Sequence, residues 1–209
     1  MTNYEYTNDT TLPSGEVGDG SVAELLLMIR SDIASSEALN ILQERVSFGR
    51  RFLSSPDLIL SLSAFATESD LTECSPIMSE IIKELESESR MMRFSETLHW
   101  RHILVLMKTL NSIEYKSTHL LRICAELLIP HLPNMSPDQM YDILTFMHRF
   151  QLSHKKLLDA MSRAIFVIPC SNKELEKLAN SLTTLDGGSA NDRALLLRLV
   201  KFRNAEILR

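Results

Sequence analysis

Glycine, proline and cysteine are scarce in this chain. Its 209 residues include only six glycines, seven prolines and three cysteines. So few glycines, together with prolines that stand where helices are expected to begin or end, favour helices over folds built from strands and tight turns. No segment alternates polar and apolar residues with the period of two that marks a half-buried strand. The sequence therefore predicts an all-α fold.

The cysteines are far apart and odd in number. They are Cys74, Cys124 and Cys170. This pattern excludes a zinc ribbon and indicates a reducing compartment. Cys124 occupies an apolar helix position, where we expect a small buried hydrophobic side chain.

Motifs for catalysis are missing as well. The sequence contains no glycine-rich phosphate loop, no Gly-x-Ser-x-Gly elbow and no His-Glu metalloprotease motif. Glu96, His99 and His102 are spaced by three residues, but on a helix they fan across more than one face, so no metal site is expected there. No apolar run is long enough to cross a bilayer. We therefore expect a non-catalytic protein with no metal, cofactor, small-molecule substrate or membrane contact.

A pattern of paired amphipathic helices recurs along the chain. Segments with a serine near their start are spaced by 34, 40, 41 and 35 residues, within the range of two-helix repeats. Those serines are Ser21, Ser55, Ser95, Ser136 and Ser171. We expect a solenoid of about four to five antiparallel helix-turn-helix pairs that forms one domain over residues 21–209. The pairs lie near residues 21–50, 55–88, 95–132, 136–169 and 171–207.

The apolar positions of the repeats align with one another. A shift of 40 residues places Ile103, Leu104, Met107 and Leu110 on Ile143, Leu144, Met147 and Phe150. A further shift of 35 residues reaches Leu178, Ala179, Leu182 and Leu185. The second helices align Leu120, Leu121, Cys124 and Leu128 with Leu157, Leu158, Met161 and Ile165. Because the spacing i, i+1, i+4, i+7 is one face of a helix, we expect these side chains to be buried between neighbouring helices.

Helix start signals agree with this periodicity. Three Ser-Pro steps predict an N-cap serine followed by proline at the first helical position. They are Ser55-Pro56, Ser75-Pro76 and Ser136-Pro137. Ser171 stands three residues before Glu174, which is the spacing of a capping box.

The two ends of the chain differ from its middle. Residues 1–20 are polar, acidic and rich in turn formers, with neither lysine nor arginine, so we expect a flexible acidic leader rather than a secretory signal or an ordinary transit peptide. A cytosolic location, a removed presequence and an unfamiliar import signal stay open. Residues 191–208 predict a last helix whose apolar face no further pair covers, and we expect a protein partner there.

Charge is distributed unevenly. Residues 1–89 hold 5 Lys/Arg and 16 Asp/Glu, a net of −11, whereas residues 90–209 hold 17 Lys/Arg and 11 Asp/Glu, a net of +6. All six histidines lie in the second part. The asymmetry indicates a surface for nucleic acid or for an acidic partner on the C-terminal pairs, with plain solvation of exposed helix faces as the alternative.

Candidate RNA contacts follow from the same alignment. The polar residues that end the first helices, Asn111, Gln151 and Asp186, fall in register, with Glu68 as a weaker fourth, and such side chains pair with base edges in repeat proteins. The alternative is that these helix ends are simply polar and capped. With the nearby cations, the candidate RNA-binding residues are Lys108, Asn111, Arg122, His148, Arg149, Gln151, Lys155, Lys156 and Arg163. Asp159 is expected to form ion pairs with Lys156 and Arg163 along one helix stripe.

One stretch resembles a known family. SPDQMYDILTFMHRFQLSHKKLLDAMSRAIF, residues 136–166, resembles the octotricopeptide and heptatricopeptide helical repeats, which also occur in relatives of the FAST kinase-like proteins. The resemblance extends loosely over residues 55–205. It implies a mitochondrial protein that binds RNA or belongs to a mitochondrial ribosome or RNA-processing complex. The chain departs from the pattern by its acidity, its lack of a readable transit peptide and its lack of a C-terminal RNA-associated domain.

Two functions are therefore expected from different classes. The first is a non-catalytic scaffold subunit of a mitochondrial ribonucleoprotein, with RNA contacts through the C-terminal pairs. The second is a protein–protein adaptor of armadillo or HEAT character, cytoplasmic or otherwise, without nucleic acid. Protein partners are expected in both cases.

Overall fold

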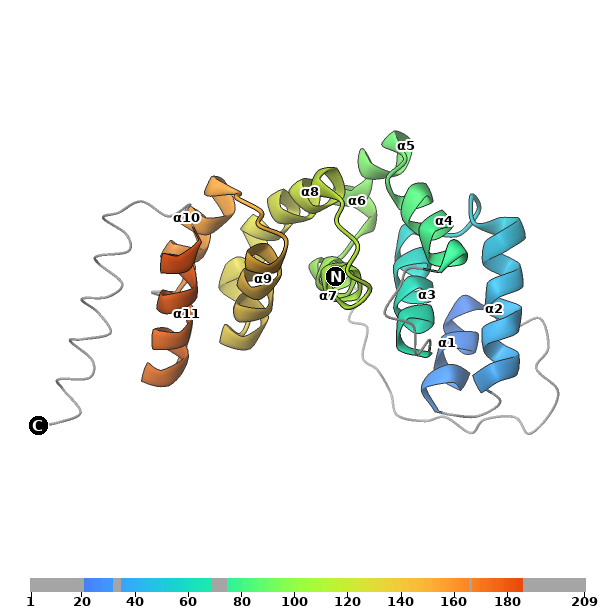
Figure 1. The fold of residues 1–209 in the computed structure, drawn as a ribbon, viewed down its shortest axis with the longest axis horizontal. Coiled ribbons are helices and arrows are strands. Elements are labelled where there is room, and N and C mark those ends of the chain that lie inside the picture. The colour runs from blue at the N-terminus through green and yellow to red at the C-terminus, as the bar shows by residue number, and fades with distance from the viewer. Residues whose placement is uncertain (1–20, 32–34, 69–74, 166, 186–209) are drawn as a thin grey trace, which may run out of the picture.

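The described part of the chain is built from helices. The computed structural model describes residues 21–31, 35–68, 75–165 and 167–185, and over these ranges it contains helices and no strand (Figure 1). The predicted all-α fold class is therefore confirmed. The expected leader over residues 1–20 and the expected last helix over residues 191–208 lie outside the described residues.

One series of helices runs along the length of the molecule. Each member of the series packs against the next, and Figure 1 shows α7, α9 and α11 along its lower side. The members are α1 (Val22–Arg30), α3 (Ser55–Glu68), α7 (Trp100–Ser112), α9 (Pro137–Arg149) and α11 (Asn172–Thr184).

The remaining helices cover this series. In Figure 1, α4, α8 and α10 lie on the upper side of the molecule, and the contacts place α2 on α1, α4 on α3, and α8 on α7. α10 packs against α8 and η1, whereas the short α5 and α6 connect α4 to α7. The bounds are α2 (Ser35–Gly49), α4 (Pro76–Leu85), α5 (Glu88–Met91), α6 (Phe94–Thr97), α8 (Thr118–Leu128), the 3₁₀ helix η1 (Ile129–Asn134) and α10 (Lys155–Ala164).

Side-chain caps explain where several helices begin. The Ser136 hydroxyl accepts a hydrogen bond from the Gln139 N–H at 3.3 Å, and the Gln139 side chain accepts one from the Ser136 N–H at 2.9 Å. Ser171 and Glu174 form the expected capping box in the same way. Ser75 caps α4 with Pro76 at the first helical position, as predicted. Each cap satisfies a backbone N–H that has no partner inside its helix.

Two predicted helix starts are wrong. α3 begins one residue earlier than expected, because the Ser54 hydroxyl accepts the Asp57 N–H at 3.2 Å and so takes the role predicted for Ser55. Ser95 lies inside the short α6, and the long helix begins at Trp100 instead. There the cap is the Nδ1 atom of His99, which accepts the Arg101 N–H at 3.3 Å.

The turns that follow α7 and α9 have the same backbone conformation. Glu114 and Gln151 have left-handed backbones, with φ of 54° and 52°. The Tyr115 N–H then donates to the Leu110 carbonyl at 3.0 Å, and the Leu152 N–H donates to the Met147 carbonyl at 2.9 Å. The equivalent residues are thus 37 apart, the same spacing that relates the N-caps His99 and Ser136.

The predicted shift of 40 residues between these first helices is therefore wrong by three. Three residues are close to one helical turn of 3.6, so the apolar pattern matches nearly as well in either register. The residue equivalent to Gln151 is Glu114, and Asn111 lies one turn earlier. The predicted shift of 37 between the second helices, and of 35 from α9 to α11, agrees with the caps.

The aligned apolar side chains form a continuous core. Those expected between neighbouring helices are buried, among them Leu104, Met107, Leu144, Met147, Leu158 and Ile165. Cys124 is fully buried as well, and burial raises the pKa of its thiol to about 12. The prediction that Cys124 serves as a small hydrophobic side chain is confirmed.

We expect replacement of Gln151 by glycine to stabilise the protein. A side chain in the left-handed region costs roughly 1 kcal/mol, a cost that glycine avoids after a helix end. The free energy of unfolding should rise by about 0.5–1 kcal/mol, measured by urea denaturation with far-ultraviolet circular dichroism. Ser153→Gly, in the same turn, is the control and should give no gain; equal effects of the two changes would contradict the backbone explanation.

Candidate functional site

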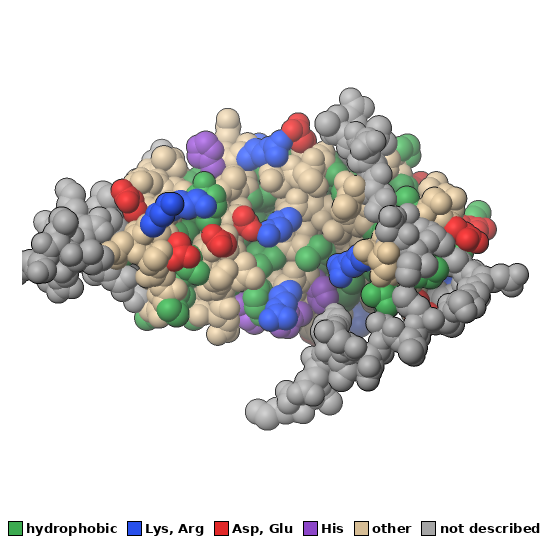
Figure 2. Space-filling view, turned by 90° about the horizontal axis from the view of Figure 1, so that it is seen from below, with side chains coloured by type: hydrophobic (Ala, Val, Ile, Leu, Met, Phe, Trp, Pro, Cys, Tyr) green, Lys and Arg blue, Asp and Glu red, His purple; other side chains and the backbone are tan. Residues whose placement is uncertain are grey.

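Several of the predicted RNA contacts are engaged with neighbouring helices. The Lys108 ammonium is 2.6 Å from the Asp142 carboxylate, which ties α7 to α9. Arg149 forms an ion pair with Glu114 and donates to Asn111, at 3.0 Å to its carbonyl and 3.2 Å to its side-chain oxygen. Figure 2 shows basic and acidic side chains intermixed on the face of the molecule that is seen from below.

These ion pairs make the cations of α7 and α9 less suited to binding RNA. Pairs so exposed stabilise a protein by at most about 1 kcal/mol each. Their larger effect is electrostatic, because a carboxylate beside each cation reduces its attraction for phosphate. Lys108, Asn111 and Arg149 are therefore brought together by the structure, but as links between α7 and α9.

The remaining predicted cations lie on α8 and α10. Arg122, Lys155 and Arg163 are exposed and form no ion pair or hydrogen bond through their side chains within the described residues. Lys156 is exposed too, and its ammonium is 3.9 Å from the Glu126 carboxylate. Cations without a neutralising carboxylate are the ones available to a phosphate.

Lys116 extends this group and was missed by the sequence analysis. It lies in the turn before α8, is exposed, and has no ion-pair partner in the described part of the chain. The signal that could have identified Lys116 is its position directly before Ser117, the residue that caps α8. The Ser117 hydroxyl accepts the Leu120 N–H at 3.2 Å. The basic surface, as named here, consists of Lys116, Arg122, Lys155, Lys156 and Arg163.

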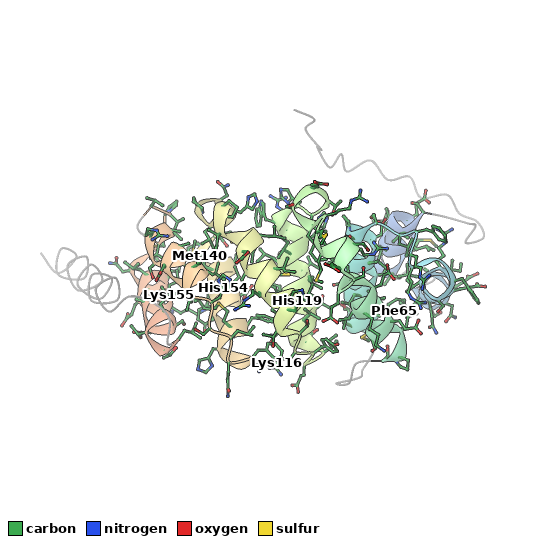
Figure 3. The ribbon with its side chains drawn as sticks, turned by 90° about the horizontal axis from the view of Figure 1, so that it is seen from above. Phe65, Lys116, His119, Met140, His154 and Lys155 are labelled. Atoms are coloured by element: carbon green, nitrogen blue, oxygen red, sulfur yellow. The ribbon has the colours of Figure 1, made fainter. Side chains whose placement is uncertain are left out.

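Figure 3, seen from above, labels two members of this surface, Lys116 and Lys155, together with His119 and His154. His119, His154 and Lys155 follow one another along the long axis, and Lys116 lies beside them toward one edge. These side chains come from α8, from α10 and from the turns before them. The surface therefore extends over α8 and α10.

The ion pairs expected for Asp159 are absent. Neither Lys156 nor Arg163 pairs with it, and Lys156 lies near Glu126 on α8 instead. One carboxylate oxygen of Asp159 is buried and has no hydrogen-bond partner among the described residues. The prediction considered only neighbours on the same helix, whereas α10 packs closely enough on α8 to offer Lys156 another carboxylate.

A pocket opens at the edge of the basic surface, and it is called the α8–α10 pocket here. Its volume is about 190 Å³. Buried apolar side chains form its floor, among them Leu121, Phe146 and Leu157. Lys116 and Arg122 are at its rim, so the pocket joins an apolar interior to two cations that lack a carboxylate partner.

His154 and Gln151 also line this pocket. The Nδ1 atom of His154 accepts the Leu157 N–H at 3.2 Å, which caps α10 and places the ring proton of the neutral form on Nε2. That Nε2 atom is 3.8 Å from the Glu126 carboxylate. Gln151 is exposed, and its side-chain amide forms no hydrogen bond within the described residues, so it has both a donor and an acceptor to offer a ligand.

The other predicted positions are dispersed. His148 is exposed at the end of α9 and lines a second hollow with Gln151 and Leu185. Asp186 and the Glu68 side chain lie outside the described residues. The proposed row of equivalent base-reading residues is therefore represented in the described structure by Gln151 and, in the corrected register, by Glu114.

Histidines cluster at the start of α7. Burial lowers the pKa of His99, and Arg101 and His131 lower it further. Burial also lowers the pKa of His102, with His99 acting in the same direction and Asp57 against it. Across the described ranges, no group of three or more His, Cys, Asp or Glu side chains could hold a metal ion.

We expect stability to fall as these histidines are protonated. A folded-state pKa below the ordinary 6.5 means that the unfolded chain binds protons first. The stabilisation is thus complete above about pH 6.5 and is lost as the pH falls through the lowered values, with a slope of at most about 1.4 kcal/mol per pH unit for each proton. Urea denaturation at several pH values between about 7.5 and 5.5 measures the loss.

The matched variant is His99→Asn with His102→Gln. Asparagine keeps a cap acceptor, and neither new side chain titrates in this range. The double variant should show a flatter pH dependence than the unchanged protein. An unchanged slope in the double variant would exclude these two groups as its cause.

The described residues include side chains that could bind a ligand by charge, by hydrogen bonds and by apolar contact. No helix among them combines the length and the apolar character needed to cross a membrane. The basic surface and the α8–α10 pocket present cations, an amide and an apolar floor side by side. Compared with known proteins, the chain matches no family model, no curated protein and no solved structure.

Proposed function

We propose that this protein is a non-catalytic scaffold that binds single-stranded RNA along its basic surface, within a ribonucleoprotein particle. We further propose that its helices form a solenoid of antiparallel pairs. The contacts from α1 through α3, α7 and α9 to α11 support that arrangement, because each helix of the series packs mainly on its neighbours.

The exposed cations of α8 and α10 carry the proposal. Arg122, Lys155 and Arg163 are free of carboxylate partners within the described residues, in contrast to Lys108 and Arg149. Phosphate contacts supply most of the sequence-independent affinity of RNA-binding proteins. A mitochondrial location is part of the proposal only through the resemblance of residues 136–166 to organellar RNA-binding repeats.

The test is salt-dependent binding of a labelled single-stranded RNA by the full chain, followed by fluorescence anisotropy. Charge reversal by Lys155→Glu with Arg163→Glu removes two phosphate contacts. The affinity should fall at least about tenfold for every RNA sequence, and the slope of log K against log salt should become shallower by about 1.4.

The control variant carries the same change of charge elsewhere. Arg93 directly precedes α6, Lys173 lies on α11, and both are exposed, so Arg93→Glu with Lys173→Glu alters the net charge equally without touching the basic surface. It should bind RNA much as the unchanged protein does. If the two double variants lose affinity equally, net charge rather than this surface governs binding; if no variant and no RNA gives salt-sensitive affinity, RNA binding is excluded.

A protein–protein adaptor is the second candidate, and three exposed apolar side chains favour it. Phe48, Phe52 and Met92 are 84%, 92% and 70% exposed. Phe52 lies in the turn between α2 and α3, and Arg90, close before Met92 in sequence, binds the carbonyls of that turn. Exposed apolar side chains gathered in one region are typical of protein contacts. A partner that Phe52→Ser releases, together with no RNA binding, would favour this function.

A further inference from the structure

The α8–α10 pocket has the size and the chemistry for one small ring. Its volume of about 190 Å³ lies below the range of about 300–1,000 Å³ that suits drug-sized ligands. The floor includes Phe146 and Met147, whose side chains are both buried. Such a floor suits a flat, polarisable ring rather than a charged group.

The rim of the pocket differs from its floor. Lys116 and Arg122 place two positive charges there, with no carboxylate paired to either within the described residues. The Gln151 side chain adds an amide that has a donor and an acceptor to offer. A ligand that fits both parts has a flat ring, polar edges and an attached anion, which is the chemistry of a nucleotide.

The surroundings favour a polyanion over a single anionic group. Beyond the rim, the basic surface continues over α10 through Lys155, Lys156 and Arg163. A peptide with one acidic residue would leave Lys155 and Arg163 without partners, whereas successive phosphates of a nucleic acid would meet them. Inserting a base requires it to leave its stack, which single-stranded RNA does at low cost.

We propose that the α8–α10 pocket takes one unstacked base of a bound single-stranded RNA, with the adjacent phosphates against Lys116 and Arg122. This inference rests on the proposed function, since it names the part of the RNA that enters the site. Phe146 and Leu157 belong to the apolar floor against which the base packs, and Gln151 contacts the base edge. The remaining cations of the basic surface hold the neighbouring phosphates and do not distinguish one base from another.

The first test compares two ligands on the unchanged full chain. One is a labelled single-stranded RNA, and the other is the same sugar-phosphate chain without bases. Both meet the basic surface equally, but only the first can fill the pocket. Stacking of a base makes the intact RNA bind roughly tenfold more tightly, whereas equal affinities overturn the inference.

The second test closes the pocket. Ser153 is exposed and lines it, so Ser153→Trp places a large ring at the opening, and Ser153→Ala is the matched control. Ser153→Trp should lower the affinity for the intact RNA about tenfold and leave that for the base-free chain unchanged, while Ser153→Ala should alter neither. Circular dichroism and thermal unfolding establish that both variants are folded.

The outcomes separate this inference from the proposed function. If Ser153→Trp binds RNA as well as Ser153→Ala does, while Lys155→Glu with Arg163→Glu still weakens binding, the RNA surface stands and the base pocket is wrong. If Ser153→Trp blocks an acidic aromatic peptide but not RNA, the pocket belongs to a protein partner. If the unchanged chain shows no salt-sensitive RNA binding, both proposals fall together.

Discussion

Replacing Arg90 by alanine is expected to lower the free energy of unfolding by about 3 kcal/mol. The Arg90 guanidinium is largely buried and donates four hydrogen bonds from α5. One reaches the Glu84 carboxylate at 2.8 Å. The others reach the carbonyls of Leu53, Arg50 and Arg51 at 2.8, 2.9 and 3.1 Å. Alanine leaves a poorly solvated carboxylate and three carbonyls without this donor.

Two comparisons isolate the guanidinium as the cause. Arg90→Lys keeps the positive charge but loses the planar set of donors, so it should recover only part of the lost stability. Arg93→Ala removes an exposed arginine from the same segment and should change the free energy of unfolding by less than about 0.5 kcal/mol. Urea denaturation measures all three. A loss for Arg90→Ala no greater than that for Arg93→Ala would show that the turn between α2 and α3 does not depend on Arg90.

Replacing Phe94 by alanine is expected to cost about 3–5 kcal/mol of stability. Phe94 is the first residue of α6 and is completely buried. α6 is short and packs against α3, and Phe94 is its buried residue. Removing the ring forfeits its burial and leaves a cavity that the surrounding helices fill only in part.

The measurement for Phe94 is again urea denaturation, with Met92→Ala as the matched control. Met92 lies two residues away but is 70% exposed, so its truncation should change the free energy of unfolding by less than about 0.5 kcal/mol. Since domains are stable by about 5–15 kcal/mol in total, Phe94→Ala should lower the urea midpoint substantially. A loss below about 1 kcal/mol would contradict a role for Phe94 in joining α6 to α3.

The features that the sequence predicted well are those decided by near neighbours in the chain. A serine cap and its partner lie three residues apart, so Ser136 with Gln139 and Ser171 with Glu174 are visible in the sequence. Burial follows from helical periodicity, which explains why the predicted apolar residues occupy the core. The cap formed by His99 escaped notice because histidine is not among the usual capping residues.

The features that the sequence did not predict depend on distant residues. A register error of one helical turn left the apolar pattern intact, and only the left-handed turns at Glu114 and Gln151 resolved it. The uneven charge indicated a basic C-terminal part, but no local pattern separates a cation that faces a carboxylate on the next helix from one that does not. Lys108 meets Asp142 across 34 positions in sequence, whereas Arg122 meets no carboxylate within the described residues.

The equal spacing of caps and turns determines which insertions or duplications in the gene preserve the helix contacts. The 37 residues from His99 to Met135 begin at one cap and stop just before the next, Ser136. A tandem duplication of that segment would therefore add a complete unit, and the cap residue that follows it would still stand directly before its helix. Inserting a single residue inside α9 would instead rotate every later apolar side chain of that helix by about 100°. Adding a whole unit of this kind to the chain leaves the helix contacts intact, whereas adding one residue inside a helix disrupts them.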